Sequence, residues 1–167
     1  MHSKTQKIVI SALMAALTCV ATMVIKIPSP LKGYMNIGDC VVLVIGWTLS
    51  PLYGFLAAGL GSALADMFLG YALYAPITFV IKGTMALISF ICFKLLNKRI
   101  GKFSARLIGG TSAEIFMALG YLIFEGCIYG FAASIVNIPA NIIQGCAGLI
   151  TGLLLIKVFE KADITIK

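Results

Sequence analysis

The residues best suited to recognise a polar solute are amide, carboxylate and phenol side chains that interrupt long apolar stretches. Asn137, Asn141 and Gln144 are spaced i, i+4 and i+7, and Tyr121 and Glu125 are one helical turn apart. Residues three and four apart share one face of a helix. These groups supply hydrogen-bond donors and acceptors. Two helix faces are therefore suited to bind a small polar molecule.

Charged residues inside the apolar stretches are few. Lys82 lies six residues after Pro76, Asp66 lies near the end of the preceding apolar run, and Asp39 stands at the start of another. Each has a simple structural explanation, because Asp39 suits a helix N-terminus and Asp66 and Lys82 suit an ion pair. Amides between helices likewise suit interhelical contacts. A shared location for all of them favours a solute site instead.

The composition describes the elements that must position these residues. The chain has 167 residues, of which 60% are hydrophobic and 11% are charged. Soluble domains have about 45–50% apolar and about 25% charged residues, so a soluble globular or disordered protein is excluded. A membrane-spanning helix needs about 20 residues. We predict an all-α integral membrane bundle of six transmembrane helices, in a single domain covering residues 1–167.

The expected helices follow from the apolar runs and the residues that interrupt them. Proline and glycine mark most of the boundaries, at Pro28-Ser29-Pro30, Ser50-Pro51, Gly70-Tyr71 and Tyr129-Gly130. A polar stretch over 97–104 is expected to form a basic loop. The predicted helices cover residues 8–25, 39–49, 51–69, 76–96, 105–126 and 132–159. The second is short for a membrane span.

On this arrangement the polar residues gather at the outer ends of five of the six helices, while Glu114 lies nearer the middle. A lysine or aspartate near the bilayer centre costs about 2.5–3.5 kcal/mol, so such residues usually face a cavity or a partner. With Tyr34, Tyr71 and Tyr74 nearby, the site suits a flat heteroaromatic molecule. The expected substrate-binding residues are Asn36, Asp39, Asp66, Lys82, Tyr121, Glu125, Asn137, Asn141 and Gln144.

The net charge of +7 is explained by the membrane topology rather than by nucleic-acid binding. Cytoplasmic loops of membrane proteins carry an excess of Lys and Arg. Both termini are therefore expected to be cytoplasmic. Ten of the thirteen basic residues stand where six helices would face one side: Lys4, Lys7, Lys94, Lys98, Arg99, Lys102, Arg106, Lys157, Lys161 and Lys167.

Metal and nucleophile chemistry find little support in the sequence. The five cysteines form no CxxC pair, and His2 is the only histidine. A histidine-based metal site and a Ser-His-Asp triad are thereby excluded. We expect no catalytic residue, no metal and no cofactor. The first apolar run leads into further spans, so we expect it to be retained rather than removed as a signal peptide.

Several motifs together resemble a known family. They are GYMNIGD over residues 33–39, ALAD over residues 63–66, Gly70-Tyr71 and YAPITFVIKG over residues 74–83. With six helices in a short chain, an outer site and Ala12-xxx-Ala16 on the first helix, the chain resembles the S component of an energy-coupling factor (ECF) transporter. The resemblance covers essentially the whole chain, and the motifs look like the pyridoxine and hydroxymethylpyrimidine branch.

The resemblance implies a substrate-binding subunit of an ABC importer in the prokaryotic cell membrane, and not an enzyme. Ala12 and Ala16 would contact the transmembrane coupling subunit, with two cytoplasmic ATPase subunits beneath it. The chain has no phosphate-binding loop of its own, so the partners would hydrolyse ATP. The loop over residues 26–38 would form a lid over a bound vitamin.

The resemblance also suggests a role for each group of site residues. The amides at 137, 141 and 144 would bind the ring edge and hydroxyls of the vitamin. Lys82 would meet an electron-rich oxygen, and Asp66 would balance its charge. Asn36 and Asp39 would connect the lid to the bundle. These roles are hypotheses.

Three alternatives stay open. The substrate could be riboflavin, thiamine or a queuosine precursor instead, whereas a single histidine disfavours a cobalt or nickel carrier. A small membrane enzyme could use Asp39, Asp66 and Glu114 for acid–base chemistry, although no activated nucleophile accompanies them. A structural subunit without a ligand would leave the polar cluster unexplained.

Overall fold

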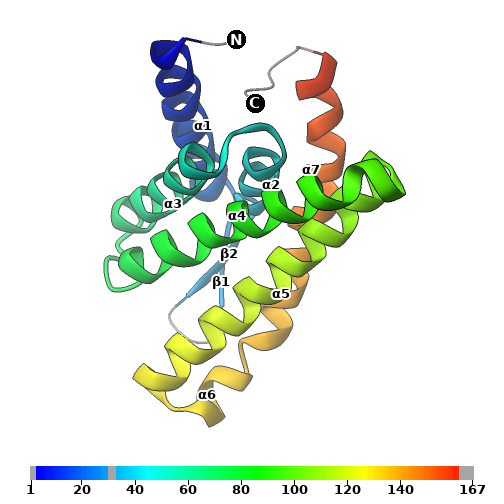
Figure 1. The fold of residues 1–167 in the computed structure, drawn as a ribbon. Helices are drawn as coiled ribbons and strands as arrows, with labels where there is room; N and C mark the ends of the chain where they lie inside the picture. The colour runs from blue at the N-terminus through cyan, green and yellow to red at the C-terminus, as the bar shows by residue number, and fades with distance from the viewer. Residues whose placement is uncertain (1–2, 30–32, 162–167) are drawn as a thin grey trace.

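The computed structural model describes residues 3–29 and 33–161. Its helices surround a short central helix, and a small β-hairpin connects the first helix with that central one (Figure 1). The elements in chain order are α1 (Lys4–Val24), β1 (Lys26–Pro28), β2 (Tyr34–Asn36), α2 (Asp39–Thr48), α3 (Pro51–Phe68), α4 (Ala75–Ile100), α5 (Lys102–Tyr129), α6 (Phe131–Ile135) and α7 (Ile138–Lys161).

The helix ends follow local sequence signals. A capping box starts α1, in which Ser3 Oγ accepts from the Gln6 amide and Gln6 Oε1 accepts from the Ser3 amide. Pro51 opens α3, where its missing N–H costs nothing. Gly101, with φ 83°, separates α4 from α5, and this left-handed backbone favours glycine. The expected loop over 97–104 is therefore wrong, because a single glycine makes the turn.

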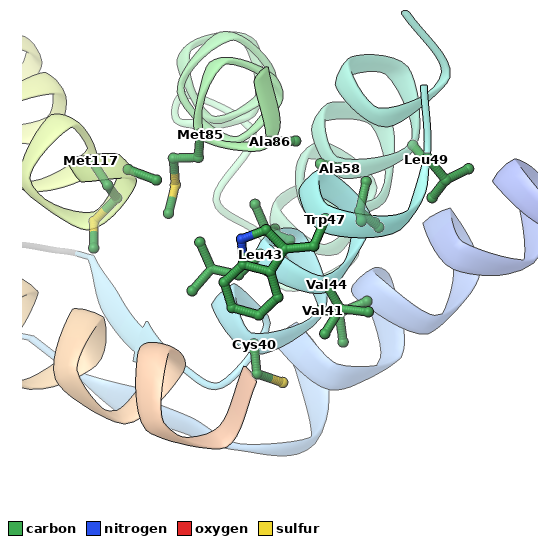
Figure 2. Packing of buried hydrophobic residues seen from close by; sticks show 14 of the residues in the cluster. Cys40, Val41, Leu43, Val44, Trp47, Leu49, Ala58, Met85, Ala86 and Met117 are labelled. Atoms are coloured by element: carbon green, nitrogen blue, oxygen red, sulfur yellow. The ribbon is translucent and has the colours of Figure 1, made fainter. Parts of the chain in front are cut away.

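The short helix α2 is the centre of the fold. All ten of its residues are buried, and α1, α3, α4 and α7 pack around it. Figure 2 shows Leu43 and Trp47 of α2 packed near Met85 of α4 and Met117 of α5. At 1.5 Å per residue such a helix is about 15 Å long, about half the hydrocarbon thickness of a bilayer. It serves as a core rather than as an independent span.

The six expected helices correspond to α1, α2, α3, α4, α5 and α7, but not all of them have the length and composition of a membrane span. Within the described residues, four helices are long and apolar enough to cross a membrane: α1, α4, α5 and α7. The all-α membrane bundle is confirmed in its main features. The last expected helix is divided, because α6 ends at Ile135 and α7 begins at Ile138. Pro139 stands in the first turn of α7, a position that suits proline.

The expected lid contains a two-stranded antiparallel hairpin that the sequence did not predict. Lys26 pairs with Asn36, and Pro28 pairs with Tyr34. The lid prediction includes residues 30–32, which lie outside the described residues, as do His2 and Lys167. The start of α1 and the end of α7 lie at the same end of the bundle (Figure 1). Which side of the membrane they face stays a prediction.

Candidate functional site

A cavity lies between the hairpin and the adjoining ends of the helices. Its volume is about 40 Å³, which is room for a few water molecules. Of the nine residues predicted to bind substrate, only Asp39 is absent from the lining, because it lies one layer deeper. The lining includes Asn36, Asp66, Lys82, Tyr121, Glu125, Asn137, Asn141 and Gln144.

The layer beneath the cavity is a buried ion pair. Lys82 Nζ of α4 contacts Asp39 Oδ1 at the start of α2, and their side chains are 3% and 0% exposed. Gln144 Nε2 of α7 donates to the other oxygen, Asp39 Oδ2, at 2.7 Å. Three helices therefore meet at one carboxylate. The expectation that Asp66 balances the charge of Lys82 is wrong, because Asp39 forms the ion pair.

The hairpin is closed over the cavity by two contacts. The backbone N–H of Asn36 donates to Gln144 Oε1 at 2.9 Å, and the Tyr34 hydroxyl donates to Asp66 Oδ1 at 2.5 Å. Burial, and after it the nearby Asp66 carboxylate, raise the pKa of Tyr34, so this phenol remains a donor at neutral pH. Gln144 thus connects the hairpin with the buried ion pair.

The opposite wall consists of residues from α5, α4 and the start of α7. Asn137 Nδ2 donates to both oxygens of Glu125, at 2.9 and 3.0 Å. The Tyr74 hydroxyl donates to Glu125 Oε1 at 3.3 Å, and the hydroxyls of Thr78 and Tyr121 are 3.0 Å apart. These residues come together because the break between α6 and α7 turns Asn137 toward α5.

Aromatic rings form a further part of the site. The ring centroids of Tyr34 and Tyr71 are 4.7 Å apart, and those of Tyr71 and Tyr74 are 6.4 Å apart in an edge-on arrangement. Lys26 Nζ lies 5.6 Å from the centroid of Tyr71, within cation–π range. The arrangement provides apolar ring faces next to hydrogen-bonding groups.

Among the described residues that line the cavity, one buried side-chain atom has no hydrogen-bond partner. Asp66 Oδ2 is buried and accepts no hydrogen bond within the described part of the chain. A buried acceptor left unpaired costs about 1–3 kcal/mol, and more when it is charged. This oxygen is therefore available to a donor on a bound solute. The sequence had predicted Asp66 as a site residue, but as the group that balances the charge of Lys82.

Four polar lining residues were missed by sequence reasoning: Thr22, Ser29, Ser62 and Thr78. Thr78 and Ser62 each precede a predicted site residue by four positions on the same helix, so their shared helix face was a usable signal. Thr22 of α1 also lines the cavity. It is isolated in an apolar run, and nothing in the local spacing distinguishes it.

The three carboxylates of the enzyme alternative do not form an acid–base pair. Asp39 contacts Lys82, and Asp66 accepts from Tyr34. Glu114 lies against Gly145 and Gly148 of α7, and Gly148 also adjoins Asp39, but Glu114 forms no hydrogen bond with another described residue. No group of three or more His, Cys, Asp or Glu side chains arranged for a metal occurs among residues 3–29 and 33–161.

The predicted partner-binding residues on α1 are accessible. Ala12 and Ala16 are both exposed. The opposite side of α1 packs closely on α3, where Gly61 meets Ala15 and Thr18. Contact with a coupling subunit remains a prediction.

Comparisons with known proteins place the chain among membrane transport subunits. The family model described as "ECF-type riboflavin transporter, S component" matches residues 2–161. A protein of Pyrococcus woesei, described as "Uncharacterized protein in gap 3'region", is 35% identical over 134 residues, which is 80% of this chain and 87% of that protein.

Two solved structures share the fold. The S component of a bacterial ECF transporter superposes with a TM-score of 0.75 at 20% identity, covering 95% of this chain and 98% of that chain. The S component for biotin from an ECF-type ABC transporter gives 0.70 at 18% identity, covering 98% and 95%. At these identities the likeness supports the fold alone.

Proposed function

The chain belongs to the riboflavin-type family of ECF transporter S components, and on this premise we propose that its cavity captures riboflavin or a closely related flavin. Membership makes it a multi-pass membrane protein and a vitamin-binding transport subunit rather than an enzyme. The family model favours riboflavin, one of the alternatives left open by the sequence, over the pyridoxine and hydroxymethylpyrimidine branch expected from the motifs.

The observation that carries the proposal is the unpartnered oxygen of Asp66 in a cavity rich in donors and acceptors. The pyrimidinedione edge of a flavin presents an N–H donor between two carbonyl acceptors. Asp66 Oδ2 accepts from such an N–H, while the Lys82 ammonium and the second hydrogen of Gln144 Nε2 provide donors for the carbonyls. Tyr71 and Tyr34 offer ring faces to a flat solute.

Lys82 can serve the vitamin without leaving its ion pair. An ammonium group has three donors, and the Asp39 contact uses only one of them. Lys82 Nζ also lies 5.7 Å from the centroid of Tyr121. A carbonyl oxygen of the vitamin would take a second donor, which keeps the buried charge paired throughout binding.

The size of the cavity favours a second candidate, a one-ring vitamin such as pyridoxine or a hydroxymethylpyrimidine. Its volume of about 40 Å³ is far below the about 300–1,000 Å³ of most ligand pockets. A smaller ring needs less rearrangement of the hairpin. Direct competition between the two vitamins distinguishes these candidates.

Delivery of the vitamin requires the ECF module, because S components work with it. Within that partnership, we propose that the exposed Ala12 and Ala16 face of α1 contacts the transmembrane coupling subunit. Small residues let helix backbones approach closely in a membrane. Two cytoplasmic ATPases would drive the cycle.

The test is to measure vitamin binding by the purified chain, with quenching of flavin fluorescence as the readout. We expect tight riboflavin binding, weakened about tenfold or more in Asp66→Asn, because a charged hydrogen bond contributes about 1.5–3 kcal/mol. Lys82→Ala should also weaken binding strongly. Lys157→Ala, at the exposed end of α7, is the control. Pyridoxine displacing riboflavin at lower concentration would favour the second candidate, and binding of no vitamin would overturn the proposal.

A further inference from the structure

A second cavity lies between α5 and α7, outside the site described above. Its volume is about 300 Å³, at the lower end of the range of ligand pockets. We call it the trough. Residues spaced by three and four line it from both helices, so it runs along their facing sides. Ile115 and Leu119 of α5 and Ile142 of α7 make its apolar walls, and each is more than half exposed.

The trough and the vitamin cavity share one residue, Asn141, which lines both. The backbone N–H of Asn141 donates to the backbone carbonyl of Asn137, as in a continuing helix. Its side chain makes no hydrogen bond to any other described residue. A side chain held by no partner changes rotamer at little cost. Asn141 is thus the residue at which the small polar cavity and the large apolar one adjoin, and its side chain is free to rotate between them.

The trough also contains a polar group that needs a ligand. Glu114 is 8% exposed, and neither of its carboxylate oxygens has a hydrogen-bond partner among the described residues. A Cβ at Gly145 would lie 3.2 Å from Glu114 Oε2, and one at Gly148 would lie 3.2 Å from Oε1. The two glycines therefore leave just enough room for the carboxyl group. A donor supplied from the trough would satisfy it.

We propose that the trough is the second half of the vitamin site and receives the apolar end of a multi-ring vitamin. This inference rests on the proposed function. The hydrogen-bonding edge stays in the outer cavity, and the apolar rings pass Asn141 and lie between Ile115 and Ile142. A hydroxyl of the vitamin donates to Glu114. The arrangement resolves the mismatch between an about 40 Å³ cavity and a three-ring ligand.

The first test fills the trough and compares two ligands. Ala118→Phe places a ring where the apolar end would lie, because Ala118 lines the trough but not the outer cavity. Ribityllumazine keeps the pyrimidinedione and the ribityl chain of riboflavin but lacks its dimethylbenzene ring. We expect Ala118→Phe to weaken riboflavin about tenfold, and to weaken ribityllumazine clearly less, about twofold to threefold, because that ligand has no benzene ring to displace and keeps only the hydroxyl that reaches Glu114. Ile143→Phe, on an exposed part of α7 that lines neither cavity, is the matched control.

The second test uses the unaltered chain, so it does not depend on a variant that folds. Cys146 lines the trough and is exposed, whereas Cys127 is exposed but lines neither cavity. Saturating riboflavin should slow alkylation of Cys146 by N-ethylmaleimide and leave Cys127 unchanged, as read by mass spectrometry. Equal alkylation of Cys146 with riboflavin bound, or equal weakening of both ligands by Ala118→Phe, would overturn the inference. A wild-type chain that binds neither flavin would overturn the proposed function itself.

Discussion

Lys82 with Asp39 and Arg106 with Glu160 are both ion pairs between helices, but they lie in contrasting surroundings. The first is near the hairpin, with side chains 3% and 0% exposed. The second is near Gly101, where Arg106 is 10% and Glu160 is 37% exposed. Lys102, 71% exposed, lies 3.5 Å from the same Glu160. Bulk water can replace a partner at the second location, whereas the first is almost completely shielded from bulk water.

The comparison shows that the contribution of an ion pair depends on its burial. A buried ion pair contributes little net stability, but removal of one partner strands a charge in an apolar interior. An exposed pair is screened by water and salt and is nearly optional. The pair near the hairpin therefore restricts which groups can enter the cavity, whereas the pairs near Gly101 only fasten α5 to α7.

The largest expected effect comes from Lys82→Ala. It leaves Asp39 buried without its ion-pair partner, which should cost about 3–5 kcal/mol in the free energy of unfolding. Thermal unfolding in detergent measures this. The double variant Asp39→Leu and Lys82→Met, which removes both charges, should recover most of the melting temperature but bind no riboflavin. If Lys82→Ala alone were as stable as wild type, the buried and the exposed ion pairs would not differ in their effect on stability.

An intermediate effect is expected for Arg106→Ala. The guanidinium donates to Glu160 at 2.8 Å and lies 5.1 Å from the centroid of Phe93 and 5.9 Å from that of Trp47. Loss of the partly buried pair and of these cation–π contacts should cost about 1–2 kcal/mol. Arg106→Lys should restore part of it. Riboflavin affinity should not change, and a large loss of affinity would show that the two regions are coupled.

The smallest effect is expected for Lys102→Ala. Its ammonium is mostly exposed and its distance to Glu160 is long, so the change in unfolding free energy should be below about 0.5 kcal/mol. The melting temperature measured at low and at high salt tests this directly. A loss as large as that of Arg106→Ala would mean that exposure is a poor guide to the worth of an ion pair here.

Local spacing predicted the parts of the site that lie along single helices. The faces carrying Asn137, Asn141 and Gln144, and Tyr121 with Glu125, all line one cavity because a helix repeats every three to four residues. Spacing carries no information on contacts between distant segments. The partner of Lys82 is 43 positions away, and the nearer Asp66 was therefore chosen wrongly.

The errors in the fold have similar physical origins. Apolar length alone suggested a span for α2, yet a helix of ten residues buried on every side serves as the core instead. A continuous apolar run hid the break before α7, although Pro139 marked the start of a new helix. The hairpin depends on contacts with Asp66 and Gln144, which no local pattern contains.

Gln144 is hydrogen-bonded both to the hairpin and to the buried ion pair. Its oxygen accepts from the hairpin at Asn36, and its nitrogen donates to Asp39 in the ion pair. Opening the hairpin therefore frees an amide that also orients the charge beneath it. Since linkage between two sites is reciprocal, any solute that stabilises the charge pair through this amide must shift the hairpin toward its closed state by the same coupling free energy. One amide thus makes solute affinity and closure of the hairpin parts of a single equilibrium.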